Sequence, residues 1–474
     1  MAADSQKPNL ILINIDDLGY AEIGPFGGKT PTPNLDRMAK EGRKLTSHYA
    51  APVCSPSRAS MMTGCYPKRV LPISGVLFPA GAVGLNPEER TVAEVLKDAG
   101  YATACVGKWH LGDQPEFLPT RQGFDSYYGI PYSNDMGPGA EGSKSNPGKP
   151  LPKGPGKGKK ANLPEDKEGI GIRGGQPPLP LMEGTNAIER VRAEQQHTIT
   201  QRYTEKAQAF IRAQKEGPFF LYLPHTAVHF PHYPRKDLIG KSGGALYQDW
   251  VMEVDWSVGQ ILDTLRELQI EGRTLVVFTS DNGGPLQQDA HNEPLRGGKG
   301  STLEGGVRVC TIAWWPGKVP AGTSVDAITT HMDFLPTFAA LGGGKAPADR
   351  KLDGHDISKL LLDAKATESP YEAFYYFRGL KLEAVRSGPW KLHLAKGELY
   401  HLGDDIGESK NIAAQNAAEV TRLRGLAAKM DEDLGNDGVG PGVRALGRVA
   451  NPKPIISLEG GVREDAAGKF KQLP

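Results

Sequence analysis

The sequence predicts an α/β fold in which a large sheet lies between helices and a small antiparallel sheet follows. Short apolar runs alternate with amphipathic segments over residues 1–365. Runs such as 9–15 and 219–223 are almost wholly apolar, as in strands buried on both faces of a parallel sheet. After residue 365, short strands are separated by turns, which is typical of antiparallel pairing. We therefore predict a large domain over 1–365 and a small one, with an extended tail, over 366–474.

The composition excludes several classes of protein. The 474 residues carry a net charge of +1, which gives no general attraction to nucleic acid or to a membrane surface. No apolar run is long enough to span a bilayer. The cysteines show no metal-ligand spacing and imply no full disulfide framework. The first residues carry no signal peptide, and we expect an exported protein (periplasmic, secreted or lysosome-like) whose signal has been removed. The oligomeric state is left open.

The helices follow from apolar periodicity and end signals. Residues 33–42 place Leu35 and Met38 on one face. Residues 91–99 are expected to form another helix, with Thr91 as the candidate cap and Glu94 three residues on. Pro56 suits a first helical turn, and Thr63-Gly64 suits a helix end. Further helices are expected over 200–214, 250–268, 333–341 and 417–434.

The strands follow from short apolar runs. In the large domain we expect them over 9–15, 102–106, 219–223, 274–279 and 311–315. In the small domain we expect them over 373–377, 382–387, 390–394 and 398–401. Residues 138–180 differ, because they are crowded with Gly, Pro and Lys and show no apolar period. They predict a long basic insertion, which is either a solvated flexible loop or a functional one.

A cysteine lies at the expected start of the helix that contains Pro56. Free backbone N–H groups at a helix N-terminus favour an anion, and Arg58, one turn on, adds a forked cation. Cys54 therefore belongs to a small anion site. The alternatives from the residues alone are a structural thiol or half of a disulfide.

Oxygen ligands follow two of the predicted strands. Asp16 and Asp17 end the first strand, and Asp281 and Asn282 follow the strand over 274–279. Adjacent carboxylates at a strand end are costly to bury unless something positive binds them. An all-oxygen set is suited to Ca²⁺ or Mg²⁺ rather than to a soft metal. The alternative is a set of solvated loop acids.

Basic side chains follow two further strands. Lys108 and His110 lie in a loop after the strand over 102–106, where α/β sheets place their sites. Histidines 225, 229 and 232 follow the strand over 219–223. Three histidines so close together raise the question of zinc, but no cysteine or paired acid completes such a set.

Several of these stretches resemble the type I sulfatases. Cys-x-Pro-Ser-Arg followed by Thr-Gly matches that family's signature at every fixed position, and Gly-Lys-Trp-His-Leu-Gly over 107–112 matches a second motif. Residues 298–308 match a third. The stretch over 123–138 looks like the subgroup of arylsulfatase A and the galactosamine-6-sulfatases. The resemblance runs from residue 9 to about residue 430 and implies an alkaline-phosphatase-like fold with a large mixed sheet.

The resemblance also implies an activity, hydrolysis of a sulfate ester, here of a carbohydrate. Cys54 would be converted to formylglycine by a formylglycine-generating or sulfatase-maturating enzyme, and its hydrate would attack sulfur. In the family, a divalent cation, usually calcium, is held together with the formylglycine oxygen. The implied ligands are Asp16, Asp17, Cys54, Asp281 and Asn282.

The remaining site residues are assigned by motif. Arg58, Lys108 and Lys299 would screen the sulfate, and His229 with Lys299 would help the alcohol leave. His110 would help to expel sulfate, and Ser133 would approach it. His225 is the weaker alternative to His229, and we expect Arg308 to be structural.

Two alternative functions remain open from the sequence. The same cations would hold a phosphoryl group, so a phosphate or phosphonate ester hydrolase is one alternative. A non-catalytic binder of sulfated glycans is the other, although a binder has no need of Cys54. The basic insertion would gather an anionic glycan through six lysines: Lys144, Lys149, Lys153, Lys157, Lys159 and Lys160.

Overall fold

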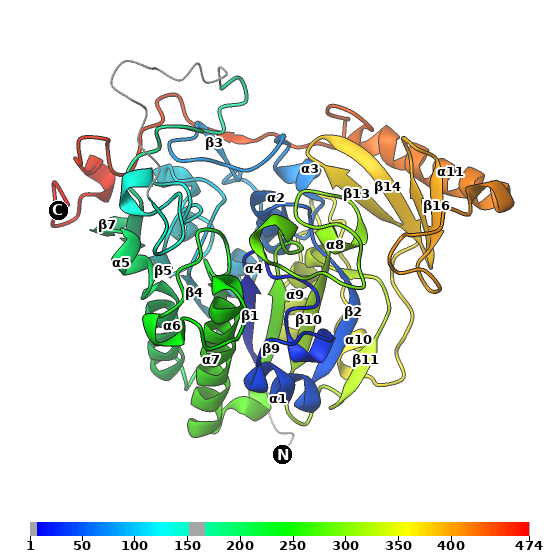
Figure 1. Cartoon of the computed structure of the whole chain (residues 1–474), viewed down its shortest axis with the longest axis horizontal. Helices are drawn as coiled ribbons and strands as arrows, with labels where there is room; N and C mark the ends of the chain where they lie inside the picture. Colours follow the sequence, from blue (N-terminus) through cyan, green and yellow to red (C-terminus); the bar gives the residue numbers. More distant parts are fainter. Residues whose placement is uncertain (1–6, 151–165, 474) are drawn as a thin grey trace.

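A mixed sheet of eleven strands forms the centre of the molecule (Figure 1). We describe a computed structural model that covers residues 7–150 and 166–473. Ten strands follow one another across the sheet: β11 (Thr323–Val325), β2 (Arg43–Tyr49), β10 (Arg308–Trp314), β9 (Thr274–Ser280), β1 (Asn9–Ile15), β8 (Phe219–Pro224), β4 (Ala102–Val106), β5 (Ser126–Gly129), β6 (Pro180–Glu183) and β7 (Asn186–Arg190). The eleventh, β12 (Thr329–Thr330), also pairs with β2.

Both faces of this sheet are covered by helices, as alternate side chains of β1 show. Leu10 and Leu12 belong to a core with α2 (Cys54–Thr63), α4 (Val92–Asp98) and α9 (Phe334–Gly342). Ile11 and Ile13 belong to the opposite core, with α1 (Pro33–Glu41), α6 (Ile199–Ala213) and α7 (Leu246–Glu267). The predicted layers, helix, sheet and helix, are therefore confirmed.

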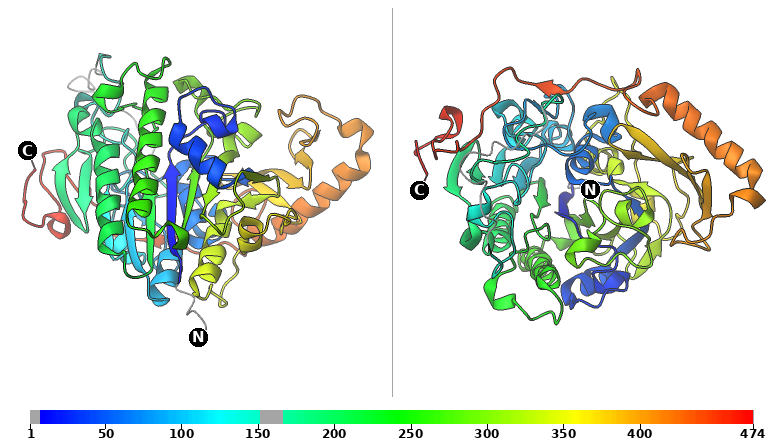
Figure 2. Two further views of the ribbon diagram at one scale, coloured as in Figure 1. Left: turned by 90° about the horizontal axis from the view of Figure 1, so that it is seen from below. Right: turned by 45° about the horizontal axis from the view of Figure 1, so that its top comes forward.

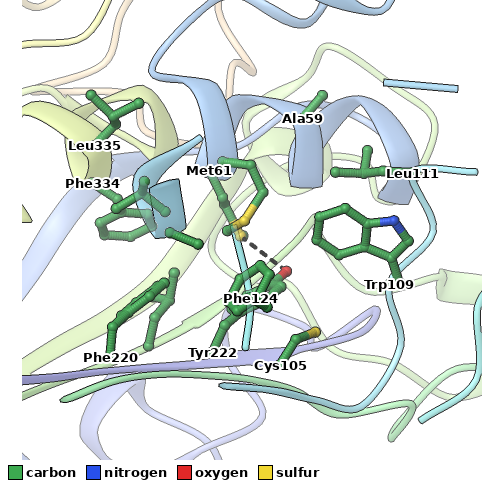
Figure 3. Close-up of a cluster of buried hydrophobic side chains, with 14 of the residues drawn as sticks. Ala59, Met61, Cys105, Trp109, Leu111, Phe124, Phe220, Tyr222, Phe334 and Leu335 are labelled. Atoms are coloured by element: carbon green, nitrogen blue, oxygen red, sulfur yellow. Dashed lines mark hydrogen bonds between the residues drawn. The ribbon is translucent and has the colours of Figure 1, made fainter. Parts of the chain in front are cut away.

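The core under α2 is rich in aromatic rings (Figure 3). Phe124 stacks against Phe220 and Tyr222 at centroid distances of 5.9 and 6.3 Å, and Trp109 meets Phe124 edge-on. The Tyr222 hydroxyl donates to the Met61 sulfur of α2 at 3.8 Å. This packing fixes α2, and with it Cys54, against the sheet.

The small C-terminal sheet is antiparallel, as predicted. Its strands are β13 (Phe374–Arg378), β14 (Lys381–Ser387), β15 (Trp390–His393) and β16 (Glu398–His401), and α11 (Ala417–Leu434) packs against it. The chain then returns to the opposite side of the molecule, where it ends near β7 (Figures 1 and 2). On the way, β17 (Gly447–Arg448) pairs with β3 (Val83–Gly84).

The predicted long helices and strands are present, with ends that differ by a few residues. The expectation missed β2, β5, β6 and β7, and α7 begins four residues before the predicted start at Trp250. It also missed the short helices α3 (Pro67–Val70), α5 (Ala193–Gln196), α8 (Glu304–Val307) and α10 (Ser358–Leu362). None of the helices that the structure describes is both long and apolar enough to cross a membrane.

The basic insertion is only partly covered by the structure. Lys153, Lys157, Lys159 and Lys160 lie outside the described residues. Lys149 is exposed, whereas Lys144 is half-buried and donates to the carbonyl oxygen of Asp135. Of these six lysines, Lys144 is thus engaged within the fold.

A buried charge network joins the two sheets. The Lys391 ammonium is fully buried, and it donates to Glu304 Oε1 at 2.9 Å and to the Thr302 carbonyl oxygen at 2.8 Å. It also forms an ion pair with Glu408 Oε1 at 2.9 Å. Burial opposes ionisation of Glu304, but Lys391 and Arg308 outweigh it and lower the pKa of Glu304 to about 2. The network therefore depends on the Lys391 charge.

Replacement of Lys391 should destabilise the fold strongly. In Lys391→Met, two buried carboxylates lose their shared counter-ion, which costs about 3–5 kcal/mol when one partner of a buried ion pair is removed. The free energy of unfolding in urea measures this loss. Lys429→Met, at an exposed position of α11, is the matched control and should change it little. A similar small change in both variants would contradict the role of the network.

A second buried carboxylate predicts a pH dependence. Glu253 on α7 accepts the Arg235 backbone N–H at 2.8 Å, but its Oε1 has no hydrogen-bond partner within the described residues. Burial raises its pKa to about 8. Between its ordinary pKa of 4.5 and 8, the folded state therefore binds more protons than the unfolded state, and stability falls as pH rises.

Glu253→Gln should remove the loss of stability that the wild type shows as pH rises. The difference in melting temperature between variant and wild type should grow in favour of the variant from pH 5 to pH 8. Thermal unfolding across that range checks it. Glu432→Gln, an exposed change on α11, should show no such trend, and a flat difference for Glu253→Gln would refute the assignment.

Candidate active site

One edge of the large sheet collects the predicted site residues. Strands β9, β1, β8 and β4 are adjacent and parallel, so their C-terminal ends meet at the same edge. The residues that follow them include Asp281 and Asn282, Asp16 and Asp17, His229, and Lys108 with His110, in that order. Because β10 is antiparallel to β9, the segment before it, with Lys299, reaches this edge too. The topology therefore explains how residues far apart in sequence meet.

Cys54 begins α2 at this edge. The N-cap residue Val53 offers no side-chain hydrogen bond, and every residue of α2 is buried. The Cys54 thiol donates to Asp16 Oδ1 at 3.1 Å. Burial, and then the charges of Asp16 and Asp281, raise the pKa of this thiol well above its ordinary value. Cys54 is therefore a neutral thiol here rather than a thiolate nucleophile.

Three carboxylates face three cations around Cys54. Lys108 contacts Asp16, and the Lys299 ammonium lies 2.7 Å from Asp17 Oδ2. The Arg58 guanidinium donates to Asp281 Oδ2 at 2.8 and 3.1 Å. Each carboxylate thus has its own cation, which compensates for burial.

The pKa values show how closely these charges are coupled. Burial would raise the pKa of Asp16, but Lys108, His229, Arg58 and Lys299 hold it well below its ordinary value. Burial and the nearby Asp16 carboxylate raise the pKa of Asp281 in spite of Arg58. The carboxylates therefore repel one another, and a further positive charge among them would relieve that repulsion.

Several side chains around Cys54 could hold a metal ion. Ligand atoms of Asp16, Asp17, Cys54 and His229 all lie within 4.8 Å of one another. Asn282 Nδ2 donates to Asp17 Oδ1 at 2.7 Å, while Asn282 Oδ1 is buried with no partner among the described residues. An amide oxygen next to carboxylates is a ligand for Ca²⁺ or Mg²⁺. This buried acidic cluster can therefore bind a metal ion.

His110 has a defined tautomer. Its Nε2 lies 2.8 Å from the Leu77 carbonyl oxygen, which can only accept, so Nε2 carries the hydrogen. Burial, with Lys108 and Arg58 nearby, lowers the pKa of His110 well below its ordinary value and keeps the ring neutral. Its Nδ1 therefore holds a lone pair, and it has no partner within the part of the chain that the structure describes.

Ser133 lies between Lys108 and His229. The Lys108 ammonium is 3.2 Å from Ser133 Oγ, and His229 Nδ1 is 3.2 Å from the same oxygen. His229 Nδ1 is also 2.6 Å from the Phe230 carbonyl oxygen, so this nitrogen carries the hydrogen. That leaves His229 Nε2 for the site, 3.6 Å from Asp17 Oδ2.

Two other predicted residues lie apart from this cluster. His225 Nε2 is 3.1 Å from Ser257 Oγ of α7, and its ring packs 6.2 Å from that of Tyr203 on α6. Arg308 Nε donates to the Thr46 carbonyl oxygen at 2.6 Å, and its guanidinium pairs with Glu304 and Asp326. His225 is thus a helix-packing residue, and Arg308 has the structural contacts expected of it.

The sequence reasoning missed two residues that support the site. The Tyr247 hydroxyl donates to the Asp17 carbonyl oxygen at 2.7 Å and accepts the Gly19 N–H at 3.0 Å. Ser55 Oγ accepts the Leu77 N–H at 3.1 Å, and Leu77 in turn holds His110. Tyr247 lies in the first turn of α7, before the apolar periodicity begins. Ser55 lies inside the signature, beside Cys54, and this position could have identified it as a residue that supports the site.

Comparison with known proteins agrees with this geometry. The family model described as Sulfatase matches residues 8–344. N-acetylgalactosamine-6-sulfatase of Sus scrofa is 38% identical over 429 residues, which cover 86% of this chain and 76% of that protein. Arylsulfatase A of Bos taurus is 38% identical over 405 residues, covering 82% of this chain and 75% of that protein.

Solved structures with a similar fold include a closer relative and a more distant hydrolase. The crystal structure of Ps i-CgsB in complex with k-i-k-neocarrahexaose superposes with a TM-score of 0.74 at 32% identity, covering 90% of this chain and 93% of that one. The phosphonate monoester hydrolase SpPMH from Silicibacter pomeroyi has a TM-score of 0.63 at 17% identity, covers 90% of this chain and 95% of that one, and shares the fold alone. With the family model matching most of the chain, this protein belongs to the sulfatase family, whose members are sulfuric ester hydrolases.

Proposed function

We propose that the chain hydrolyses a sulfate ester of a carbohydrate at the edge where Cys54 lies. The observation that carries the proposal is the cluster of Lys108, Lys299 and Arg58 with three carboxylates around Cys54. The relatives support the substrate class, because one is named for an N-acetylgalactosamine 6-sulfate and another was solved with a carrahexaose.

A divalent cation, Ca²⁺ or alternatively Mg²⁺, would be held by oxygens of Asp16, Asp17, Asp281 and Asn282, together with position 54. The carboxylates and the three basic side chains carry cancelling charges, so a bound divalent cation would make the site positive, attract an anionic ester and polarise the nucleophile. Arg58 would then contact other protein groups rather than the sulfate. Its donors hold Asp281 and the Lys108 carbonyl oxygen, so it positions a ligand and a sulfate-binding residue.

We propose that Cys54 is converted to formylglycine by a maturating enzyme, which makes that enzyme a partner during biogenesis. The hydrate of this aldehyde would supply the nucleophilic hydroxyl, and a second hydroxyl from which sulfate can be expelled. A thiol whose pKa is raised by burial offers neither. The hydrate therefore supplies chemistry that an unmodified thiol at position 54 lacks.

The chain's own residues provide the other functions. Lys108, Lys299 and Ser133 would bind the sulfate oxygens, since they line the cluster from three different loops. His229 Nε2 faces the site, but the ring hydrogen is on Nδ1, and burial with Lys299 nearby lowers the pKa of His229. The positive charge of the neighbouring Lys299 ammonium would therefore stabilise the leaving alcohol, with His229 beside it. His110 Nδ1, with its free lone pair, would take a proton when sulfate is expelled.

The same cations would also hold a phosphoryl group, so hydrolysis of a phosphate or phosphonate ester is the alternative activity. A phosphonate monoester hydrolase has the same fold. Rates on 4-nitrophenyl sulfate and 4-nitrophenyl phosphate distinguish the two activities. The proposal expects a clear preference for the sulfate. A preference for the phosphate would overturn it, and no turnover of either would favour a glycan-binding role. Export from the cytoplasm is also proposed, and fractionation of the native host checks it.

Cys54 should carry an aldehyde in active enzyme. Peptide mass spectrometry of the segment that contains α2 should find the mass of formylglycine or its hydrate. Cys54→Ala should lose nearly all turnover because no nucleophile remains, while the Tm stays close to that of the wild type, since only one small side chain changes. Cys65→Ala, at another buried cysteine outside the cluster, is the control and should keep the activity. Full activity from a preparation with only unmodified thiol would disprove the proposal.

Metal removal should abolish activity and destabilise the fold. Without a cation the coupled carboxylates repel one another, so chelation should lower the Tm as well as the rate, and Ca²⁺ or Mg²⁺ should restore both. Asp281→Ala should bind the cation at least about tenfold more weakly, as measured by calorimetry on the chelated protein. Unchanged rates in a preparation shown to be metal-free would contradict the assignment.

A further inference from the structure

A groove lies between the segment that carries Lys299 and the small C-terminal sheet. We call residues 296–303 the Lys299 loop. The groove has a volume of about 350 Å³ and is lined by the Lys299 loop on one side and by β13, β14 and the β15–β16 turn on the other. Figure 1 shows α8, which directly follows this loop, beside β13 and β14.

The groove continues toward Cys54. A neighbouring hollow of about 210 Å³ shares Gly300 and Arg378 with it and is also lined by Val53 and Pro56, on either side of Cys54. The Gly300 N–H donates to the Pro52 carbonyl oxygen at 2.9 Å, which ties the Lys299 loop to the start of α2. The groove is thus an extension of the site's surroundings rather than a separate region of the surface.

The lining of the groove has an excess of positive charge. Four of its side chains are cationic and two are acidic: Arg296, Arg378, Lys381, Lys396, Glu383 and Glu398. The Arg378 guanidinium already pairs with Glu383, to which it donates at 2.6 and 2.9 Å. Lys381 makes no ion pair with any residue that the structure describes, and Lys396 is 3.9 Å from Glu398. The two lysines therefore have donors to spare for a ligand.

Both walls are held in fixed positions. Thr302 Oγ1 donates to Glu383 at 2.8 Å, and the buried Lys391 ammonium donates to the Thr302 carbonyl oxygen at 2.8 Å. Arg296 donates to the Glu408 carbonyl oxygen at 2.9 Å. A pre-formed groove needs little ordering on binding, which favours affinity.

The accessible side of the active site is the side of this loop. The Lys299 side chain is 23% exposed, whereas Asp16 and Arg58 are fully buried. The His229 side chain is also partly exposed, at 11%. A sugar attached to the reacting sulfate therefore leaves the site on the side of Lys299 and His229, and Gly300, next to Lys299, already lines the groove.

We propose that this groove binds a second anionic group of the same glycan, a sulfate or a carboxylate on a sugar next to the one that is desulfated. Lys381 and Lys396 are the residues that determine this specificity. The inference rests on the proposed function and deepens it, because it makes the small sheet part of the substrate site.

The test compares two inhibitors of 4-nitrophenyl sulfate hydrolysis by the mature enzyme. N-acetylgalactosamine 6-sulfate carries one anionic group, and a chondroitin 6-sulfate tetrasaccharide carries several. In wild type the tetrasaccharide should inhibit more strongly. In Lys381→Ala/Lys396→Ala its inhibition constant should rise about three- to tenfold, as expected for two exposed ion pairs. High salt should reduce the difference between variant and wild type.

Three controls isolate the groove. Lys429→Ala removes an exposed charge from α11, outside the groove, and should leave both inhibition constants unchanged. Lys381→Arg/Lys396→Arg keeps the charge and should retain most of the affinity for the tetrasaccharide. The kcat and KM for 4-nitrophenyl sulfate should be the same in all variants.

Three results would overturn the inference: equal inhibition by the two compounds in wild type, an unchanged constant for the tetrasaccharide in the double alanine variant, or an equal rise for the monosaccharide. Failure of the proposed function is distinct, because it would appear as wild-type enzyme that does not turn over 4-nitrophenyl sulfate. A tetrasaccharide with methyl-esterified carboxylates tests which anion the groove binds. If wild type and the double alanine variant then have the same inhibition constant, the groove binds a carboxylate. If the two constants still differ, it binds a sulfate.

Discussion

The balance of buried charge at the sheet edge is the constraint on which the rest of the structure depends. Asp16, Asp17 and Asp281 are removed from water, and ions removed from water are stable only when partners lie within contact distance. Each partner comes from a different loop, so the sheet order, the α2 packing and the Lys299 loop must all be correct together. Left-handed backbone at Asp17 and His110 (φ of 65° and 64°) shows the local cost of aiming these side chains.

Much of the fold follows from local sequence, because apolar strands and capped helices carry their own signals. β2 does not, since Arg43-Lys-Leu-Thr-Ser-His-Tyr49 has no apolar run. Arg43 is nevertheless buried, because its guanidinium donates to the carbonyl oxygens of Asp363 and Ala366, about 320 residues away. Only the folded chain supplies those acceptors, so sequence reasoning could not place this strand.

The sequence predicted which residues form the candidate site better than it predicted the contacts between them. Motifs and strand ends identify Asp16, Lys108 and His229, but they do not say which cation pairs with which carboxylate. Arg58 is the clearest case. Its position in the signature suggests contact with the sulfate, whereas its donors hold Asp281 and the Lys108 carbonyl oxygen. Such pairings depend on which strands are neighbours, and a linear sequence does not show that order.

The contacts that hold the Lys299 loop come from much later in the chain. Residues 296–304 are fixed by Glu383, Lys391 and Glu408, which a ribosome adds only some eighty to a hundred residues later. A nascent chain that has emerged through α9 contains every residue of the catalytic cluster, yet this loop still lacks its supports. The position of this loop therefore depends on residues of the small sheet, which lie far downstream in the chain.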